Sequence, residues 1–234
     1  MKPVLTVDAV LFDAVGTLIE PDPPVASAYE AAGRRYGSAL SREEVLRRFR
    51  AAFARQERLD ETELMGRTDE PRERRRWQAI VGEVFDDVAD SDGLFDDLWR
   101  HFASSAHWRL CAGAADCWRT LAERGLTLGI ASNFDARLEA VCQGLAPLDQ
   151  CRFLFISSRL VGVRKPHPAF FAAIAERLNL PPSRILLAGD DLDNDYRAAE
   201  AAGWQSVLID PAGRHAVERR ITSLAELPAF VRCS

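Results

Sequence analysis

Five short runs of apolar residues limit the folds open to this chain of 234 residues. They show almost no alternation of apolar and polar side chains, a pattern typical of strands that are covered on both faces. The runs are Ala9–Phe12, Leu126–Ala131, Phe153–Ile156, Ile185–Ala188 and Ser206–Ile209. They predict a parallel sheet, because strands buried on both faces occur mainly in parallel sheets flanked by helices.

Segments with helical spacing separate the later runs. Ala114–Arg124 has apolar residues at that spacing and stops at Gly125, a natural helix C-terminus. Pro168–Leu178 begins with proline, which suits the first position of a helix, and Asn194–Ala202 stops at Gly203. Strands that alternate with helices predict a Rossmann-like α/β fold with a doubly wound parallel sheet.

Residues 24–105 interrupt this alternation and contain no convincing strand. They have the spacing of four amphipathic helices, at Tyr29–Tyr36, Arg42–Leu59, Pro71–Val88 and Leu94–Ala103. A stiff, proline-rich segment leads into the first of them. The pattern predicts an all-helical insertion between the first strand and the rest of the sheet.

The boundaries of the two parts follow from this change of pattern. We expect a Rossmann-like core of residues 1–19 and 106–234, with an all-helical domain at 20–105. Segments 19–24 and 104–113, where the chain leaves and re-enters the core, are the expected hinges.

The overall charge and the apolar runs exclude some partners. The formal net charge is −5 at pH 7, so no global positive field draws the chain to nucleic acid or to an anionic membrane. No apolar run approaches the roughly 18 residues of a membrane span. Asp8 and Asp13 interrupt the apolar N-terminus, unlike a secretory signal. We expect a cytoplasmic protein that binds neither nucleic acid nor a membrane.

Arginines are concentrated in the helical part, where residues 34–76 hold 13 Arg and nine acidic residues. The simplest interpretation is that helix faces of opposite charge attract one another. A second interpretation is that some arginines between Arg72 and Arg76 face an anionic substrate.

Polar and charged residues follow four of the predicted strands. They are Asp13 after the first run, Ser132 and Asn133 after the second, Lys165 after the third, and Asp190 and Asp195 after the fourth. Ligands of parallel sheets bind beyond the carboxyl ends of the strands. A carboxylate, a hydroxyl, an ammonium and an acidic cluster are therefore expected to meet at one edge.

This combination suits phosphoryl transfer. A carboxylate can attack phosphorus and form an acyl phosphate. A divalent cation held by carboxylates, together with a lysine, offsets the repulsion between the two anions, and oxygen ligands favour magnesium. Single residues also have structural interpretations, since Asp193 or Asn194 could cap the following helix. The joint order of the residues favours a site.

The same segments resemble the motifs of a known family. FDAVGTL at Phe12–Leu18, SN at 132–133, KP at 165–166 and GDDLDND at 189–195 resemble, in order, the four motifs of the haloacid dehalogenase-like superfamily. The resemblance covers nearly the whole chain, and the helical insertion looks like the cap domain of that superfamily. It implies a hydrolase that depends on Mg²⁺.

The resemblance also implies a role for each matched residue. The implied nucleophile is Asp13, and the implied phosphoryl-binding residues are Ser132, Asn133 and Lys165. The implied metal ligands are Asp13, Asp190, Asp195 and the backbone carbonyl of Val15.

Val15 is also where the chain departs from the superfamily's phosphatases. They carry a second Asp two residues after the nucleophile, which protonates the leaving group and then activates water. Such general acid–base catalysis contributes typically about 10²–10⁴-fold. Glu20 and Asp22, just past the first motif, are candidate substitutes.

Three interpretations remain open at this stage. The first is a phosphatase of a small phosphorylated metabolite that uses another acid or releases a good leaving group. The second is a 2-haloacid dehalogenase, a branch that also lacks the second Asp but typically lacks the metal-binding motif present here. The third is a catalytically weak domain that binds a phosphorylated ligand or a protein. Phosphonoacetaldehyde hydrolase is excluded, because that chemistry needs a cap lysine and residues 24–105 contain none.

Overall fold

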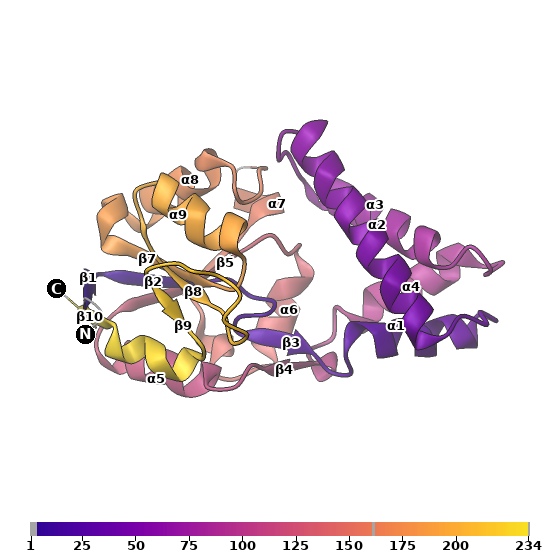
Figure 1. Ribbon diagram of the computed structural model, residues 1–234, viewed down its shortest axis with the longest axis horizontal. Helices are drawn as coiled ribbons and strands as arrows, with labels where there is room; N and C mark the ends of the chain where they lie inside the picture. Colours follow the sequence, from indigo (N-terminus) through magenta and orange to yellow (C-terminus); the bar gives the residue numbers. More distant parts are fainter. Residues whose placement is uncertain (1–3, 161, 234) are drawn as a thin grey trace.

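The computed structural model describes residues 4–160 and 162–233. Its main sheet has six parallel strands in the order β6-β5-β2-β7-β8-β9 (Figure 1). The strands are β2 (Ala9–Phe12), β5 (Thr127–Ser132), β6 (Phe153–Ile156), β7 (Ile185–Gly189), β8 (Gln205–Ile209) and β9 (Arg220–Ile221). All five predicted runs are strands of this sheet, so the predicted fold class is confirmed.

Helices cover both faces of the sheet, which explains the lack of alternation in its strands. Val10 and Phe12 of β2 belong to one apolar cluster, whereas Leu11 between them belongs to another. The first cluster includes residues of α5 (Ala114–Glu123) and α6 (Arg137–Gln143). The second includes residues of α8 (Pro168–Leu178) and α9 (Ala198–Ala201).

The four predicted helices of the insertion are present as a separate lobe (Figure 1). They are α1 (Val25–Arg35), α2 (Arg42–Thr62), α3 (Glu70–Val84) and α4 (Ser91–His101). Short polar side chains cap three of them, since Ser41, Asp69 and Asp90 each accept a hydrogen bond from a backbone N–H of the first turn. The lobe has its own apolar cluster, distinct from the two clusters of the sheet.

Two predicted helix starts need correction. The first helix begins at Val25, immediately after Pro24, rather than at Tyr29. The helical segment after β7 begins with a π-helical stretch at Leu192–Arg197, which α9 continues. Its N-terminus is capped by Asp191, which accepts from the N–H groups of residues 193 and 194, and not by either of those residues.

Short strands accompany the chain where it leaves and re-enters the core. β3 (Ile19–Pro21) pairs antiparallel with β4 (Trp108–Leu110), so the two segments expected as hinges form one ribbon. A second small pair, β1 (Leu5–Val7) with β10 (Val231–Cys233), joins the two ends of the core. The division into a core and a mobile cap remains a prediction.

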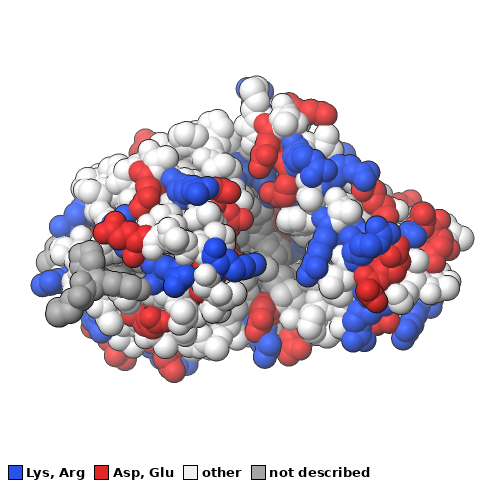
Figure 2. All heavy atoms as spheres, in the orientation of Figure 1, with Lys and Arg blue, Asp and Glu red and all other residues white. Residues whose placement is uncertain are grey.

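On the face shown in Figure 2, Lys and Arg lie among Asp and Glu, so no large patch carries charge of a single sign. No helix in the described part of the chain is long and apolar enough to cross a membrane.

Candidate active site

Asp13 lies directly beyond the carboxyl end of β2, at the centre of the sheet. Its backbone N–H donates to the carbonyl of Ala188 at 2.9 Å, which ties the residue to the neighbouring strand β7. The chain then turns at Gly16, whose φ of +93° is one that L side chains rarely adopt. A Cβ at this glycine would lie 2.5 Å from Oδ2 of Asp190, so the close approach of the two loops requires glycine there.

The side chain of Lys165 connects three separate segments of the chain at this edge of the sheet. Its Nζ donates to Oδ1 of Asp13 at 2.8 Å, to Oδ1 of Asp195 at 2.6 Å and to the carbonyl of Ala131 at 2.9 Å, which uses all three ammonium hydrogens. Burial by itself would lower the pKa of Lys165, but the two carboxylates outweigh it and raise that pKa. The buried side chain therefore stays a cation.

Asn133 holds the loop that carries the lysine. Its Oδ1 accepts from the backbone N–H of Lys165 at 2.8 Å, and its Nδ2 donates to the carbonyl of the same residue at 3.0 Å. Both ends of the amide are therefore engaged with backbone, although Asn133 was expected to contact substrate. Ser132 is different, because its Oγ accepts from the N–H of Phe134 at 3.2 Å and keeps its own hydrogen for another acceptor in the cavity.

Three carboxylates converge beside this lysine. One oxygen from each of Asp13, Asp190 and Asp195 lies within 4.8 Å of the other two. Asp195 is fixed by Lys165 and by the N–H of Asp191, which donates to its Oδ2 at 3.1 Å. Thr17 donates to Oδ1 of Asp190 at 3.3 Å.

The three carboxylates repel one another when all of them are ionised. Although Asp190 keeps part of its surface exposed, partial desolvation beside the cavity, followed by the nearby Asp195, raises the pKa of Asp190 to about 6. Burial and the neighbouring Asp13 raise the pKa of Asp195 to about 6 even though Lys165 opposes the shift. With all three acids ionised and one ammonium present, two negative charges remain. The oxygen donors and this residual charge fit a divalent cation such as Mg²⁺.

Val15 offers no replacement for a proton donor, because its side chain is aliphatic and 38% exposed at the edge of the cavity. The two candidate substitutes flank Pro21, which lines the cavity, but do not line it themselves. Glu20 forms an ion pair with Arg109 at 2.8 Å across the β3–β4 ribbon. Neither Glu20 nor Asp22 is among the residues that line the cavity, so the expectation that one of them replaces the missing acid finds no support in the geometry.

A cavity of about 410 Å³ lies between the sheet edge and the helical lobe. Figure 2 shows the surface hollowed between the two parts of the molecule. All seven predicted site residues line this cavity: Asp13, Val15, Ser132, Asn133, Lys165, Asp190 and Asp195. The sequence pattern did not predict the aromatic part of the lining, to which residues 20–105 contribute seven side chains and the segments after them two. They are Tyr29, Phe49, Phe53, Trp77, Phe95, Trp99, Phe102, Trp108 and Phe134.

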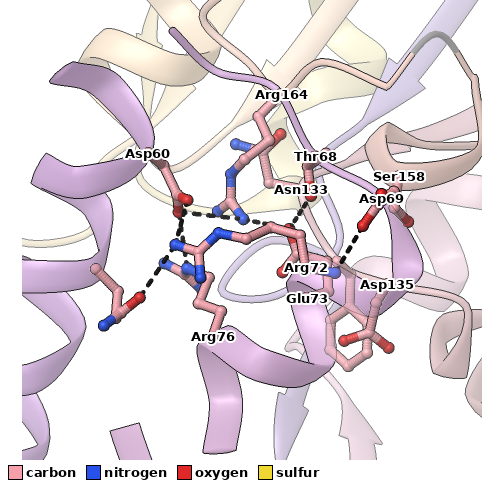
Figure 3. Close-up of polar contacts among 12 residues, drawn as sticks. Asp60, Thr68, Asp69, Arg72, Glu73, Arg76, Asn133, Asp135, Ser158 and Arg164 are labelled. Carbon is pink, nitrogen blue, oxygen red and sulfur yellow. Dashed lines mark hydrogen bonds and ion pairs between the residues drawn. The ribbon is translucent and has the colours of Figure 1, made fainter. Parts of the chain in front are cut away.

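A network of buried ion pairs connects the helical lobe to the lysine loop (Figure 3). Arg164, the residue before Lys165, donates to Oε1 of Glu73 at 2.7 Å and to Oε1 of Glu57 at 3.0 Å. Arg76 of α3 pairs with Glu57 and, at 2.9 Å, with Asp60. The sequence offered one signal for this network, the surplus of arginine in the helical part.

The arginines of this network already have carboxylate partners, although Arg76 and Arg164 line the cavity. Arg72 pairs with Asp60 at 2.7 Å, and Arg76 is both paired and buried. For these two residues, the geometry fits the interpretation that charged helix faces attract one another. It does not fit the interpretation that they face an anionic substrate.

The chain is similar in sequence to known hydrolases. Residues 7–203 match the haloacid dehalogenase-like hydrolase family. Haloacid dehalogenase-like hydrolase domain-containing protein 3 of Danio rerio is 28% identical over 231 residues, which cover 94% of each chain. Phosphoglycolate phosphatase of Escherichia coli (strain K12) is 30% identical over 217 residues, which cover 85% of this chain and 79% of the relative.

The fold has a close counterpart among solved structures. The L-2-haloacid dehalogenase of Xanthobacter autotrophicus, with chloropropionic acid covalently bound, superposes with a TM-score of 0.72. The two chains are 20% identical, and the superposition covers 96% of this chain and 98% of the other. At this identity the likeness concerns the fold.

Proposed function

Given that this chain belongs to the haloacid dehalogenase-like hydrolases, we propose that it is a Mg²⁺-dependent phosphatase of a small phosphorylated metabolite. One observation carries the proposal. Asp13 meets Lys165 at 2.8 Å while Asp190 and Asp195 place carboxylate oxygens within 4.8 Å of it, a cluster that retains two negative charges. A dehalogenase that works without a metal does not need a cluster of acids with residual negative charge.

In the proposed reaction, Asp13 attacks the phosphorus of the substrate and the bond from phosphorus to the leaving oxygen breaks. Lys165 orients the attacking carboxylate and offsets the charge of the phosphoryl group. The hydroxyl of Ser132 donates to a phosphoryl oxygen. Water then attacks phosphorus in the aspartyl phosphate, which releases inorganic phosphate and restores Asp13.

The proposed metal ligands are Asp13, Asp190, Asp195 and the backbone carbonyl of Val15. Bound Mg²⁺ would neutralise charge that develops on the phosphoryl oxygens. The chain's own contribution is to hold the acids close together at the sheet edge, and Lys165 and the N–H of Asp191 fix the most buried of them, Asp195.

We propose that residues 20–105 act as the cap of this enzyme. Their aromatic side chains form one wall of the cavity, and the sheet edge with Asp13 forms the other. Closure of such a lobe excludes water from the reacting groups. The β3–β4 ribbon is the proposed connection about which the lobe moves.

A release assay tests the proposal and separates it from the alternatives. Purified protein is incubated with p-nitrophenyl phosphate or with 2-chloropropionate, each with Mg²⁺ and with a chelator. We expect phosphate release that requires Mg²⁺ and no chloride release. Chloride release without metal would identify a dehalogenase, the alternative that Val15 keeps open. Binding of a phosphate ester without turnover would identify a binding domain.

The variant Asp13→Asn tests the nucleophile. It retains the size of the side chain but removes the attacking carboxylate, so we expect a folded protein whose turnover falls to background. Circular dichroism and thermal unfolding verify the fold beside the rate measurement. Activity equal to that of the wild type would exclude Asp13 as the nucleophile.

A further inference from the structure

The cavity beside Asp13 has a chemical character that narrows the substrate. We infer that the substrate is an aryl phosphate, a phosphate monoester whose leaving oxygen is bonded directly to an aromatic ring and which carries no second anionic group. The inference rests on the proposed phosphatase function and names the substrate class for it. Three independent features of the cavity support it.

The first feature is the aromatic wall. Six of the nine aromatic residues in the lining are only partly buried, so part of each side chain remains uncovered: Phe49, Phe53, Trp77, Trp99, Phe102 and Phe134. The cavity of about 410 Å³ is in the range of small-molecule sites, which are about 300–1,000 Å³ and mostly apolar. Offset or edge-to-face contacts with such side chains favour a planar ring.

The second feature is that each cation in the described lining already has a carboxylate partner. Arg137 donates to both oxygens of Asp135, at 2.8 and 2.6 Å, and its guanidinium lies 3.6 Å from the ring centroid of Trp99. Arg76 and Arg164 belong to the network of Figure 3, and Lys165 pairs with Asp13 and Asp195.

This pairing leaves one place for negative charge, the phosphoryl position beside Asp13, where the proposed Mg²⁺ would offset it. A substrate with a second anionic group, such as phosphoglycolate with its carboxylate, would have to bury that group without a free cation, which is costly. A neutral ring needs no such partner. The charge pattern therefore separates an aryl phosphate from the substrate named for the bacterial relative.

The third feature is the absence of a proton donor at Val15. Other acids of the described lining are committed, since Glu57 pairs with Arg76 and Arg164, and Asp191 caps the helix that follows it. An aliphatic alcohol has a pKa close to that of water, about 15.7, so it needs a proton to leave. A phenol, like the tyrosine side chain, has a pKa of about 10 and can leave as the anion.

The reaction balances without a general acid. A carboxylate oxygen of Asp13 forms a bond to phosphorus as the bond from phosphorus to the aryl oxygen breaks, and the electron pair leaves with the aryloxide. Water then bonds to phosphorus, the bond from Asp13 to phosphorus breaks, and the water proton passes to solvent. The products are a phenol, after protonation by solvent, and inorganic phosphate.

A series of four phosphates tests the inference with wild-type protein and Mg²⁺. Phenyl phosphate has the ring and the good leaving group. Benzyl phosphate has the ring but an alcohol leaving group, acetyl phosphate has a good leaving group without a ring, and phosphoglycolate has a second charge. We expect kcat/KM for phenyl phosphate to exceed that for benzyl phosphate and phosphoglycolate by about 10²-fold or more, the usual contribution of a general acid.

The outcomes of this series distinguish a failure of the aryl phosphate inference from a failure of the proposed phosphatase function. Hydrolysis of benzyl phosphate or phosphoglycolate as fast as phenyl phosphate would overturn the aryl phosphate inference and leave the phosphatase proposal intact. Acetyl phosphate as the preferred substrate would also overturn it, because the ring would then contribute nothing. Failure to hydrolyse any of the four would remove the phosphatase function itself.

A pair of variants tests the role of the aromatic wall. Phe49→Leu removes one ring of the lining, and we expect the ratio of kcat/KM for phenyl over acetyl phosphate to fall about 3- to 10-fold, as expected for one aromatic contact. Phe153→Leu is the control, since this partly buried phenylalanine on the edge strand β6 lies outside the cavity. An equal change in both variants, or no change in Phe49→Leu, would contradict the inference.

Discussion

In the proposed reaction, the carboxylate of Asp13 depends on the residues around it. Lys165 gives one hydrogen bond to it, a second to Asp195 and a third to a strand carbonyl, so the position of the ammonium is set by three separate segments. Asn133 in turn holds the backbone of Lys165 at both its N–H and its carbonyl. Among the predicted site residues, Val15 is the one whose side chain has no polar group.

A change at Val15 tests the consequence of the missing acid. Val15→Asp places a carboxyl group where related phosphatases have their proton donor. We expect a rise of about 10-fold or more in kcat/KM for benzyl phosphate and little change for phenyl phosphate, because general acid catalysis matters most for the poorer leaving group. Val15→Asn is the matched control, since it has similar size and polarity but no acid. Equal gains in the two variants would refute proton transfer as the cause.

The pH dependence of Mg²⁺ binding is a second test at this scale. Because the pKa values of Asp190 and Asp195 are raised to about 6, both acids hold protons below that pH and must lose them to bind the metal. We expect the affinity for Mg²⁺ to decrease as the pH falls through about 6 and to level off above about 7. Isothermal titration calorimetry at pH 5 and 7.5 measures this. An affinity that is the same at both values would contradict it.

Helix α3 and the segment before it contact the lysine loop directly. Residues 66–68, which precede it, pair with 162–164 through two backbone hydrogen bonds of 2.8 Å, from Thr68 to Gly162 and from Arg164 to Gly66. Glu73 on α3 then accepts from Arg164 within the buried network (Figure 3). The helical lobe thus holds the residue next to Lys165, which links the proposed cap to the proposed catalytic lysine without a direct contact.

Glu73→Gln tests this link. The substitution keeps the shape of the side chain and removes the charge that pairs with buried Arg164, and breaking a buried pair from one side costs about 3–5 kcal/mol. Arg164 also pairs with Glu57, so we expect the lower end, about 3 kcal/mol, in chemical denaturation. Asp96→Asn is the control, because its pair with Arg74 is exposed and such pairs contribute at most about 1 kcal/mol. A loss in Glu73→Gln no larger than in the control would refute the buried link.

The whole molecule has two apolar bodies that meet around one charged edge. The sheet buries apolar clusters on both faces, the helical lobe buries a third, and the cavity lies between them. Each body therefore has a core of its own, and the site is assembled where the two approach. Three acids and one lysine at this junction leave the metal-free protein with uncompensated negative charge.

Metal binding should accordingly stabilise the entire fold. A ligand that binds only the native state adds about 2.7 kcal/mol at 100 times its dissociation constant. We expect Mg²⁺ to raise the midpoint of thermal unfolding and a chelator to reverse the rise. Asp190→Asn removes one ligand and one repulsive charge, so this variant should melt higher than the wild type without metal and gain less from Mg²⁺. A wild type whose midpoint does not respond to Mg²⁺ would argue against the metal site.

Local features of the sequence were enough to predict the sheet and its helices. The run Ala9–Phe12 coincides with β2, Phe153–Ile156 with β6 and Pro168–Leu178 with α8. Burial on both faces leaves a signature within a few consecutive residues, so neighbours along the chain carry it. The charged residues at the strand ends could be predicted for the same reason, because parallel strands present their carboxyl ends at one edge.

Contacts between distant segments were decided by the tertiary structure. The pairing of Arg164 with Glu73, 91 positions away along the chain, depends on how α3 rests against the lysine loop, and helical periodicity does not specify that orientation. The packing of distant segments also decides that Asn133 bonds to backbone, that Glu20 pairs with Arg109 and that aromatic side chains line the cavity. An amphipathic pattern says which face of a helix is apolar, whereas the packing of whole elements decides whether that face meets a core or encloses a substrate.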